Sequence, residues 1–207
     1  MRRTALGSHP TPQVCQPHTH PPLSLRPMFK RWFQRREAPR LQVLMVCMGN
    51  ICRSPMAEGV LRAKLDRAGL ADQVAVDSAG THGFHRGALP DPRAVAQAAQ
   101  RGYRLDGLKS RPVVAADFSR FDLLLAMDRE NLAMLRSRCP PGATGQLALL
   151  LPYAAQSLER SASAGAVDEV PDPYFGNAEG FAHALDLIEP ACDGLLWVLQ
   201  RRLTSSA

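Results

Sequence analysis

The sequence lacks a hydrophobic run long enough to cross a bilayer, and its N-terminal part lacks the apolar stretch of a secretory signal. We therefore expect a cytoplasmic protein without stable membrane insertion. Its five cysteines are odd in number and form no Cys-x-x-Cys pair and no cluster with histidines. This pattern argues against a secreted disulfide scaffold and predicts that the protein holds no structural zinc.

Most of the chain also lacks an excess of charge of one sign. The net charge is +6, but residues 1–40 hold eight of the 25 Lys and Arg and one of the 19 acidic residues. The remaining residues hold 17 basic and 18 acidic side chains and are close to neutral. A role in binding nucleic acid therefore has little support, and we expect no nucleic-acid partner.

Residues 1–40 differ from the rest of the chain in composition as well. Residues 1–27 are rich in proline and histidine and have no periodic apolar pattern, so we expect a basic, largely disordered extension. Met28 could be the true start, and the basic aromatic run after it could touch lipid or a partner, or pack loosely. We expect one globular domain over residues 41–202 and a tail at residues 203–207.

A cysteine and an arginine with five residues between them carry the main functional signal. Residues 42–46 form an apolar run that predicts a buried strand ending next to Cys47. Gly49 and Asn50 tolerate positive φ, so the chain can turn sharply after this strand. The residues between Cys47 and Arg53 are therefore expected to form a tight loop.

A helix is predicted to begin directly after this loop, because Ser54 suits a helix N-cap and Pro55 suits the first helical position. Loop N–H groups and the helix N-terminus form an anion site, to which Arg53 can add two parallel donors for phosphate oxygens. The same positive potential favours the thiolate of Cys47. The predicted phosphate-binding residues are Met48, Gly49, Asn50, Ile51, Cys52, Arg53 and Ser54.

Each of these residues also has an ordinary structural interpretation. Cys47 alone could be a small buried side chain at a strand end, and Arg53 alone could be a solvated residue at a helix start. Both together, with turn and cap residues in place, favour a phosphate site with a nucleophile in it.

The motif resembles that of the low-molecular-weight protein tyrosine phosphatases. Several phosphatase groups share the Cys-x5-Arg-Ser spacing, but the string VCMGNICRSPMAE at residues 46–58 is much more specific. The similarity covers about residues 41–200 and continues at residues 77–81, 91–94, 121–131 and 172–177. The resemblance implies a single α/β domain with helices on both faces of a doubly wound parallel β-sheet.

The apolar patterns predict the same fold class independently. Strand-like runs alternate with helical stretches, at residues 43–46, 74–76, 123–126 and 147–150 for the strands and near residues 55–68, 91–100, 129–136 and 177–200 for the helices. Pro190 is expected to kink or divide the last helix. Ligands of such sheets bind at the carboxyl ends of the strands, where Cys47 is expected to lie.

The resemblance also implies a reaction and three catalytic residues. Cys47 attacks phosphorus and forms a cysteinyl-phosphate, Arg53 and the loop amides hold the oxygens, and Asp172 is general acid and then general base. No metal and no cofactor are needed. An isolated Asp-Pro pair is usually only a turn, but here it reproduces the acid loop of the family. The nearby Asp168 and Glu169 are interpreted as solvated loop charges.

Aromatic side chains are predicted to wall the substrate crevice. They are Phe84, in a polar glycine-rich segment, and Tyr174 and Phe175, directly after the acid, with Met48 beside the nucleophile. A deep aromatic crevice suits phosphotyrosine better than the shorter phosphoserine, although each residue could simply pack. Ile51 also favours phosphotyrosine, because the related arginine phosphatases resemble this loop but carry a smaller threonine there.

Three polar residues, Asn50, Ser54 and Ser78, match positions that support the loop in the family, and turn or cap chemistry is compatible with that role. The chain departs from the family at Leu108, where a histidine is common, and at Pro112, which replaces a glutamine. We therefore expect the loop to lack one of its hydrogen-bond partners.

Cys52 lies in the same loop as Cys47, and the resemblance implies a reversible disulfide between them under oxidation. Such a bond would protect the nucleophile from irreversible oxidation, but Cys52 could equally be a small residue that fits the loop. Cys139 and Cys192 are interpreted as structural or incidental, and Asp128 as a helix cap.

Two other functions remain open. Thioredoxin-coupled arsenate reductases resemble this fold but need two further cysteines, for which Cys139 and Cys192 are poorly placed. A module that binds phosphate without turnover is disfavoured by the retention of all three catalytic residues. The leading prediction is a phosphatase for phosphotyrosine in proteins and small aryl phosphates. In bacteria, the resemblance suggests an autophosphorylated tyrosine kinase or a host protein as substrate; the sequence does not indicate the oligomeric state.

Overall fold

The computed structural model describes residues 38–156 and 168–205 of the 207-residue chain. The predictions for residues 1–37 lie outside the described residues. One parallel sheet with the strand order β2-β1-β3-β4 forms the centre of the described part. Its strands are β1 (Leu41–Cys47), β2 (Val74–Gly80), β3 (Leu123–Ala126) and β4 (Gln146–Leu149).

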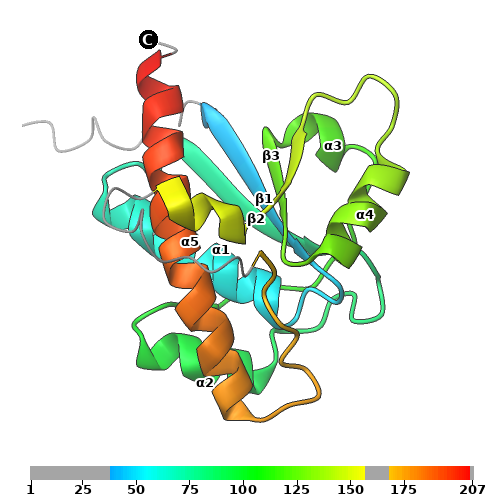
Figure 1. The fold of residues 1–207 in the computed structure, drawn as a ribbon, viewed down its shortest axis with the longest axis vertical. Helices are drawn as coiled ribbons and strands as arrows, with labels where there is room; N and C mark the ends of the chain where they lie inside the picture. Colours follow the sequence, from blue (N-terminus) through cyan, green and yellow to red (C-terminus); the bar gives the residue numbers. More distant parts are fainter. Residues whose placement is uncertain (1–37, 157–167, 206–207) are drawn as a thin grey trace, which may run out of the picture. The chain divides into compact units, whose positions relative to one another are not determined.

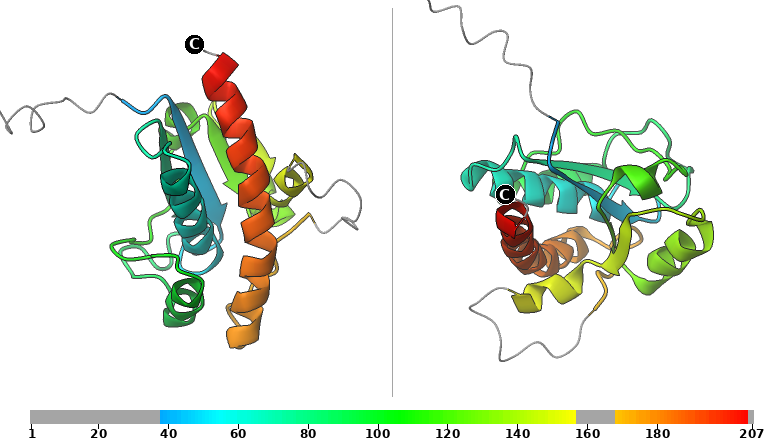
Figure 2. Two further views of the ribbon diagram at one scale, coloured as in Figure 1. Left: turned by 90° about the vertical axis from the view of Figure 1, so that its left-hand side faces the viewer. Right: turned by 90° about the horizontal axis from the view of Figure 1, so that it is seen from above.

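Helices cover both faces of this sheet (Figures 1 and 2). On one face α1 (Arg53–Arg67) packs against α5 (Ala178–Ser205), with α2 (Pro92–Gln100) and the 3-10 helix η2 (Leu151–Gln156) beside them. On the other face lie α3 (Asp117–Arg120) and α4 (Arg129–Arg138). None of the helices among the described residues is long and apolar enough to cross a bilayer.

The central strand β1 explains why the fold has two cores. Val43 and Met45 belong to the hydrophobic cluster under α1 and α5, whereas Leu44 and Val46 belong to the cluster under α3 and α4. All four side chains are fully buried. A strand that is covered on both faces reads as a continuous apolar run, so the predicted doubly wound α/β fold is confirmed.

The predicted strands and the four long helices all occur, with ends that differ by a few residues. The short helices α3 and η2 have no periodic signal in the sequence. Pro190 was expected to kink or divide the last helix, and it does not divide it, because α5 continues through Pro190. Ile188 and Cys192 are fully buried on either side of it, and packing of both halves on the core compensates for the lost backbone hydrogen bond.

The strand order brings the carboxyl end of β1 to the switch point of the sheet. The chain passes from β1 to β2 on one side and returns to β3 on the other side. Ligands bind at this place in doubly wound sheets, and Cys47 is the last residue of β1. Gly80 lies opposite Cys47 on β2, and a Cβ atom there would be 2.7 Å from the Met48 carbonyl oxygen. Only glycine therefore lets the chain after Cys47 pass so close to β2.

Candidate active site

The segment between β1 and α1 turns around the sulfur atom of Cys47. Asn50 has a φ of 56°, and its backbone N–H donates to Cys47 Sγ over 3.3 Å. The Ser54 hydroxyl lies 3.0 Å from the same sulfur. α1 begins at Arg53 with Cys52 as its N-cap, so the positive end of the helix lies at this loop. These features stabilise negative charge on the sulfur or on an anion beside it.

The helix begins two residues earlier than predicted, so Ser54 is not its N-cap and Pro55 is its third residue. The Ser54 hydroxyl instead lies between Cys47 Sγ and Asn50 Nδ2. Pro55 is tolerated because the N–H groups of the first helical turn have no partner within the helix. Ser54 thus contacts the sulfur directly.

Arg53 is buried behind the loop and is oriented by two carboxylates. Its Nη1 donates to Asp128 Oδ2 over 2.6 Å and to the Val170 carbonyl over 3.1 Å, and its Nη2 donates to Asp172 Oδ2 over 2.7 Å. Asp128 is also the N-cap of α4 and accepts from the Asn131 N–H over 2.6 Å. The predicted cap is confirmed, and its second contact, with Arg53, was not apparent from the sequence.

Asp172 reaches the site from the segment that precedes α5. Its Oδ1 accepts from the Tyr174 N–H over 3.2 Å while Oδ2 pairs with Arg53, and the side chain is 39% exposed. The neighbouring carboxylates of Asp168 and Glu169 both pair with the exposed Arg129 instead. Of these three carboxylates, only Asp172 lines the cavity that contains Cys47.

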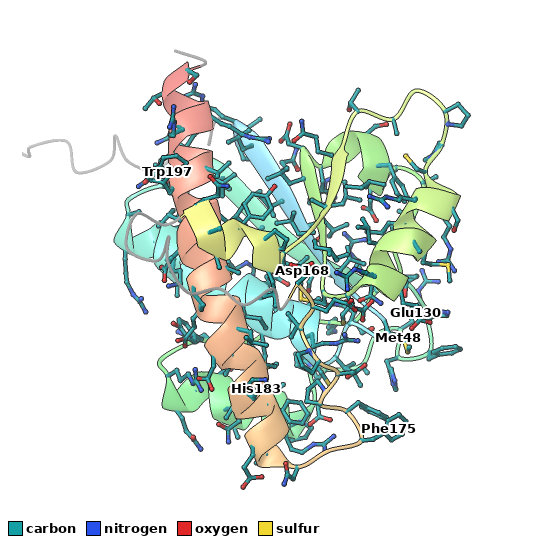
Figure 3. All side chains as sticks on the ribbon, in the orientation of Figure 1. Met48, Glu130, Asp168, Phe175, His183 and Trp197 are labelled. Carbon is teal, nitrogen blue, oxygen red and sulfur yellow. The ribbon has the colours of Figure 1, made fainter. Side chains whose placement is uncertain are left out.

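This cavity has a volume of about 320 Å³. It is lined by Cys47, Met48, Gly49, Ile51, Cys52, Arg53, Phe84, His85, Asp172, Tyr174 and Phe175. Phe175 is 97% exposed and points outward (Figure 3), with its ring edge-on to Tyr174 at 4.9 Å. Phe84 is 75% exposed and stacks on His82 at 5.0 Å. The cavity thus has an apolar, aromatic mouth and a polar floor at Cys47. His85 is a lining residue that the sequence did not single out.

Comparison with known proteins identifies the family. Residues 42–205 match the family described as low molecular weight phosphotyrosine protein phosphatase. A low molecular weight protein-tyrosine-phosphatase of Streptomyces coelicolor is 42% identical over 166 residues, which cover 80% of this chain and 98% of that protein. The chain belongs to the low molecular weight protein tyrosine phosphatase family. It is therefore an enzyme of the hydrolase class.

Solved structures of other phosphatases have the same fold. A protein tyrosine phosphatase of Entamoeba histolytica with Hepes in its active site is 37% identical, with a TM-score of 0.69, over 78% of this chain and 97% of that one. The Drosophila arginine phosphatase is 33% identical, with a TM-score of 0.68, over 77% of this chain and 98% of that one. Because the fold serves both, the substrate must be argued from the site.

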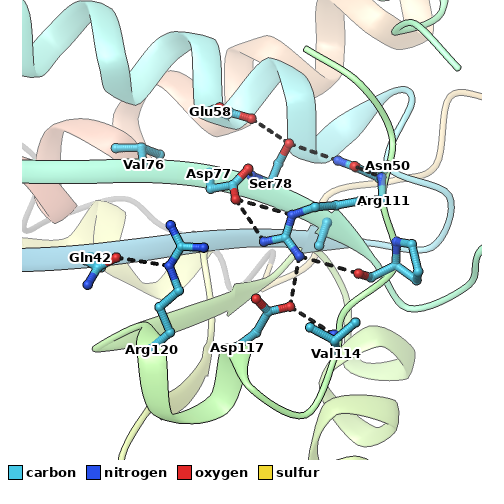
Figure 4. A network of polar contacts seen from close by, with 12 residues as sticks. Gln42, Asn50, Glu58, Val76, Asp77, Ser78, Arg111, Val114, Asp117 and Arg120 are labelled. Carbon is cyan, nitrogen blue, oxygen red and sulfur yellow. Dashed lines mark hydrogen bonds and ion pairs between the residues drawn. The ribbon is translucent and has the colours of Figure 1, made fainter. Parts of the chain in front are cut away.

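The phosphatase loop rests on a network of buried side chains (Figure 4). Asn50 Nδ2 donates to Ser54 Oγ over 3.0 Å and to Ser78 Oγ over 2.9 Å. Asn50 Oδ1 accepts from the Arg111 backbone N–H over 2.9 Å. The three residues predicted to support the loop therefore lie in one network, and these contacts hold Asn50 in its left-handed conformation.

The segment that carries Leu108 also contacts the loop, through the residues that follow. Leu108 itself packs against the hydrophobic core. Ser110 is buried and donates to the Gly49 carbonyl over 3.0 Å. The Arg111 guanidinium pairs with Asp77 at 2.8 Å and Asp117 at 2.9 Å, which fixes the backbone whose N–H reaches the loop. The loop is thus held by hydrogen bonds from this segment although the histidine is absent.

Glu58 is a buried residue of the network that sequence reasoning missed. It lies on α1 one turn after Ser54, and its Oε2 accepts from Ser78 Oγ over 2.5 Å. Its other oxygen pairs with the half-exposed Arg62 at 2.5 Å. Burial raises the pKa of the Glu58 carboxyl, and the Ser78 hydrogen bond and Arg62 oppose this shift. The sequence signal was a carboxylate among the apolar residues of the first helix.

Replacing Glu58 with glutamine is expected to stabilise the fold more at pH 7 than at pH 4. Below pH 4.5, the ordinary pKa of this carboxyl, most of the unfolded protein and nearly all of the folded protein carry the group in its neutral form. As pH rises further, the unfolded state ionises first, so the buried carboxyl increasingly disfavours folding. Urea unfolding of both proteins at the two pH values measures the difference. An equal change in the free energy of unfolding at pH 4 and pH 7 would contradict the raised pKa of Glu58.

The other three cysteines of the described residues lie in different environments. Cys52 lines the cavity, and burial, followed by the charges of Asp91 and Cys47, raises its pKa to about 12. Cys192 is buried in α5 with its Sγ near the Ala57 carbonyl, and Cys139 follows α4. Neither Cys139 nor Cys192 lines the cavity, so the structure offers no support for an arsenate reductase relay.

Proposed function

We propose that this phosphatase hydrolyses phosphotyrosine in proteins, and small aryl phosphates, through a cysteinyl-phosphate on Cys47. The observation that carries the proposal is the meeting of Cys47, Arg53 and Asp172 in one cavity with an aromatic mouth. The aryl ring lies between Phe84, Tyr174 and Phe175, and the phosphoryl group lies in the loop. The catalytic domain is proposed to span residues 41–202.

In the first step Cys47 Sγ attacks phosphorus and the bond to the phenolic oxygen breaks. The loop N–H groups and Arg53 hold the three equatorial oxygens, where charge redistributes in the transition state. Asp128 orients Arg53 for this task through the contact at 2.6 Å. Asp172 gives its proton to the departing phenolic oxygen, which would otherwise leave as a phenolate.

In the second step water replaces the sulfur on phosphorus. Asp172, now a carboxylate, takes a proton from the attacking water. The bond between sulfur and phosphorus breaks, which regenerates the Cys47 thiolate and releases inorganic phosphate. The Ser54 hydroxyl at 3.0 Å from Sγ supports the thiolate in both steps. All the proton transfers use residues of this chain, so the reaction requires no metal or cofactor.

The substrate class is tested with three phosphopeptides of one sequence, carrying phosphotyrosine, phosphoserine or phosphoarginine, in the presence of EDTA. Release of phosphate from the phosphotyrosine peptide alone is expected, because Ile51 lines the cavity where the arginine phosphatases carry a smaller threonine, and the aromatic walls suit a phenyl ring. Faster turnover of phosphoarginine, or activity that EDTA abolishes, would contradict the proposal.

An autophosphorylated bacterial tyrosine kinase is a candidate protein substrate, and a cytoplasmic location remains a prediction.

We further propose that Cys52 protects Cys47 during oxidation. Peroxide converts Cys47 to a sulfenic acid, which condenses with the Cys52 thiol to form a disulfide and water. Oxidation of Cys47 also removes one of the charges that raise the pKa of Cys52, and the thiolate that attacks the sulfenic acid becomes easier to form.

After peroxide and then dithiothreitol, wild-type enzyme is expected to recover most of its activity, whereas Cys52→Ser should recover only a small part. Cys192→Ser is the matched control and should behave as wild type, because Cys192 lies in the core outside the cavity. Equal recovery in all three proteins would show that Cys52 only fills space in the loop.

A further inference from the structure

Arg93, in the first turn of α2, binds the loop that carries Asp172. Its Nη1 donates to the Gly176 carbonyl over 2.8 Å, and its Nη2 donates to the Tyr174 carbonyl over 3.0 Å. The guanidinium also lies over the Phe181 ring, 4.6 Å from its centroid. One side chain of α2 thus contacts the acid loop at two carbonyls and the start of α5 at an aromatic ring.

Asp91 fixes the orientation of this guanidinium. Its Oδ1 accepts from Arg93 Nε over 3.0 Å and its Oδ2 accepts from Arg93 Nη2 over 2.8 Å. The Asp91 side chain is itself held in place, because it caps the N-terminus of α2 and accepts a hydrogen bond from the Arg93 backbone N–H over 2.8 Å. A planar guanidinium paired at two atoms has little rotational freedom.

The contacts continue from Arg93 to Asp172 through one residue. Tyr174 accepts from Arg93 at its carbonyl, and its backbone N–H donates to Asp172 Oδ1 over 3.2 Å. The segment is a turn closed by the bond from the Gly176 N–H to the Pro173 carbonyl, 2.9 Å long. Because it has no regular secondary structure, the bonds from Arg93 define where this turn sits.

Asp91, the partner of Arg93, also contacts the phosphate loop. The Asp91 backbone N–H donates to the Ile51 carbonyl over 2.8 Å. Asp91 and Arg93 therefore connect the loop around Cys47 with the loop that carries Asp172, although the two loops are more than a hundred residues apart in the sequence.

We propose that Arg93, oriented by Asp91, is a positioning residue that sets Asp172 at the leaving oxygen of a phosphoryl group held by the Cys47 loop. The inference rests on the proposed acid role of Asp172. Proton transfer requires hydrogen-bond distance between the acid and the leaving oxygen. Loss of Arg93 therefore weakens acid catalysis and leaves the phosphate loop intact.

Arg93→Met is the first variant, and Arg101→Met is its matched control. Arg101 follows the other end of α2, donates to the Ala182 carbonyl over 3.0 Å and pairs with Asp186 and Glu189 on α5. It anchors α2 as Arg93 does but has no contact with the acid loop among the interactions of the described residues. A purely structural role for Arg93 would make the two variants alike.

The rate constants to be compared are kcat/KM for phenyl phosphate, which has a poor leaving group, and for p-nitrophenyl phosphate, which has a good one. kcat/KM reports the step in which the leaving group departs, whereas the later hydrolysis of the cysteinyl-phosphate is the same for both substrates. Arg93→Met should lower kcat/KM for phenyl phosphate by about 10-fold to 100-fold, the scale of a misplaced catalytic group. The loss for p-nitrophenyl phosphate should be several times smaller, and inhibition by inorganic phosphate should be unchanged. Arg93→Lys keeps the charge but replaces the planar fork, which meets Asp91 and both carbonyls through three nitrogens, with a single ammonium group, so it should show a smaller loss of the same kind. Arg101→Met should keep the wild-type ratio of the two rates.

A double-mutant cycle completes the test. In the Asp172→Ala background, Arg93→Met should have little further effect on phenyl phosphate, since the group that it positions is gone. Equal losses for both substrates in Arg93→Met and Arg93→Lys, or losses that multiply with those of Asp172→Ala, would overturn the inference. If Asp172→Ala alone lowers both rates equally, the acid role of Asp172 fails and the inference fails with it. Failure of the proposed function is thus distinguished from failure of the positioning role of Arg93 alone.

Discussion

Cys47→Ser is expected to abolish turnover while the protein still binds phosphate. The serine hydroxyl is a far weaker nucleophile at neutral pH than a thiolate held by the Asn50 N–H and the Ser54 hydroxyl. Loss of a covalent nucleophile lowers kcat by at least about 10⁴-fold, on the scale known for serine proteases. The donors for the phosphoryl oxygens, in the loop and on Arg53, remain in place.

Hydrolysis of p-nitrophenyl phosphate in EDTA and titration with inorganic phosphate measure the two properties of the variant. Cys139→Ser is a matched control, because Cys139 does not line the cavity, and should retain wild-type activity. Residual turnover of Cys47→Ser within about 10-fold of wild type would exclude a cysteinyl-phosphate pathway. Loss of phosphate affinity together with activity would show that the variant has damaged the loop.

Asp172→Ala is expected to have the second largest effect, with a dependence on the leaving group. Removal of a general acid lowers kcat by ~10²–10⁴. The loss of kcat/KM, which reports the step in which the leaving group departs, should be greatest for phenyl phosphate and smaller for p-nitrophenyl phosphate, since a nitrophenolate leaves without a proton. The variant also removes one partner of Arg53, so phosphate affinity is measured in parallel to separate the two effects.

Asp168→Ala is the matched control for this variant. Asp168 lies four residues before Asp172 on the same segment, but it pairs with Arg129 and does not line the cavity. It should keep wild-type rates for both substrates. If Asp172→Ala lowers kcat/KM equally for the two substrates, or if Asp168→Ala shows the dependence on the leaving group, the acid has been assigned to the wrong carboxylate.

Local patterns predicted the parts of this fold that depend on neighbouring residues. The buried strand before Cys47 and the loop with Gly49 and Asn50 follow from apolar runs and turn chemistry over about a dozen residues. The helix start was two residues off, because the Ser54 hydroxyl serves the sulfur of Cys47 and not the helix end. Local patterns also failed at Pro190, since the tertiary packing that keeps α5 continuous has no signal in the neighbouring sequence.

The site residues that the sequence did not reveal act over long separations. Arg53 meets Asp172 across 119 residues, and only the resemblance to a family pointed to that aspartate. Glu58 and Arg93 lie in segments that resemble the family, but no local pattern assigned a role to them or to Ser110, because their contacts with Ser78, Tyr174 and Gly49 exist only in the folded chain. Leu108 in place of a histidine predicted that the loop lacks a hydrogen-bond partner. The neighbouring Ser110 and Arg111 nevertheless donate hydrogen bonds to the loop, and the sequence alone does not indicate these contacts.

The phosphorylated intermediate tests the central claim most directly. Enzyme is mixed with p-nitrophenyl phosphate, quenched in acid during turnover and digested, and the peptide that contains Cys47 and Cys52 is analysed by mass spectrometry. The account predicts one added phosphoryl group on Cys47 in the wild type and none in Cys47→Ser. Turnover without a phosphorylated cysteine, or with the phosphoryl group on Cys52, would contradict it.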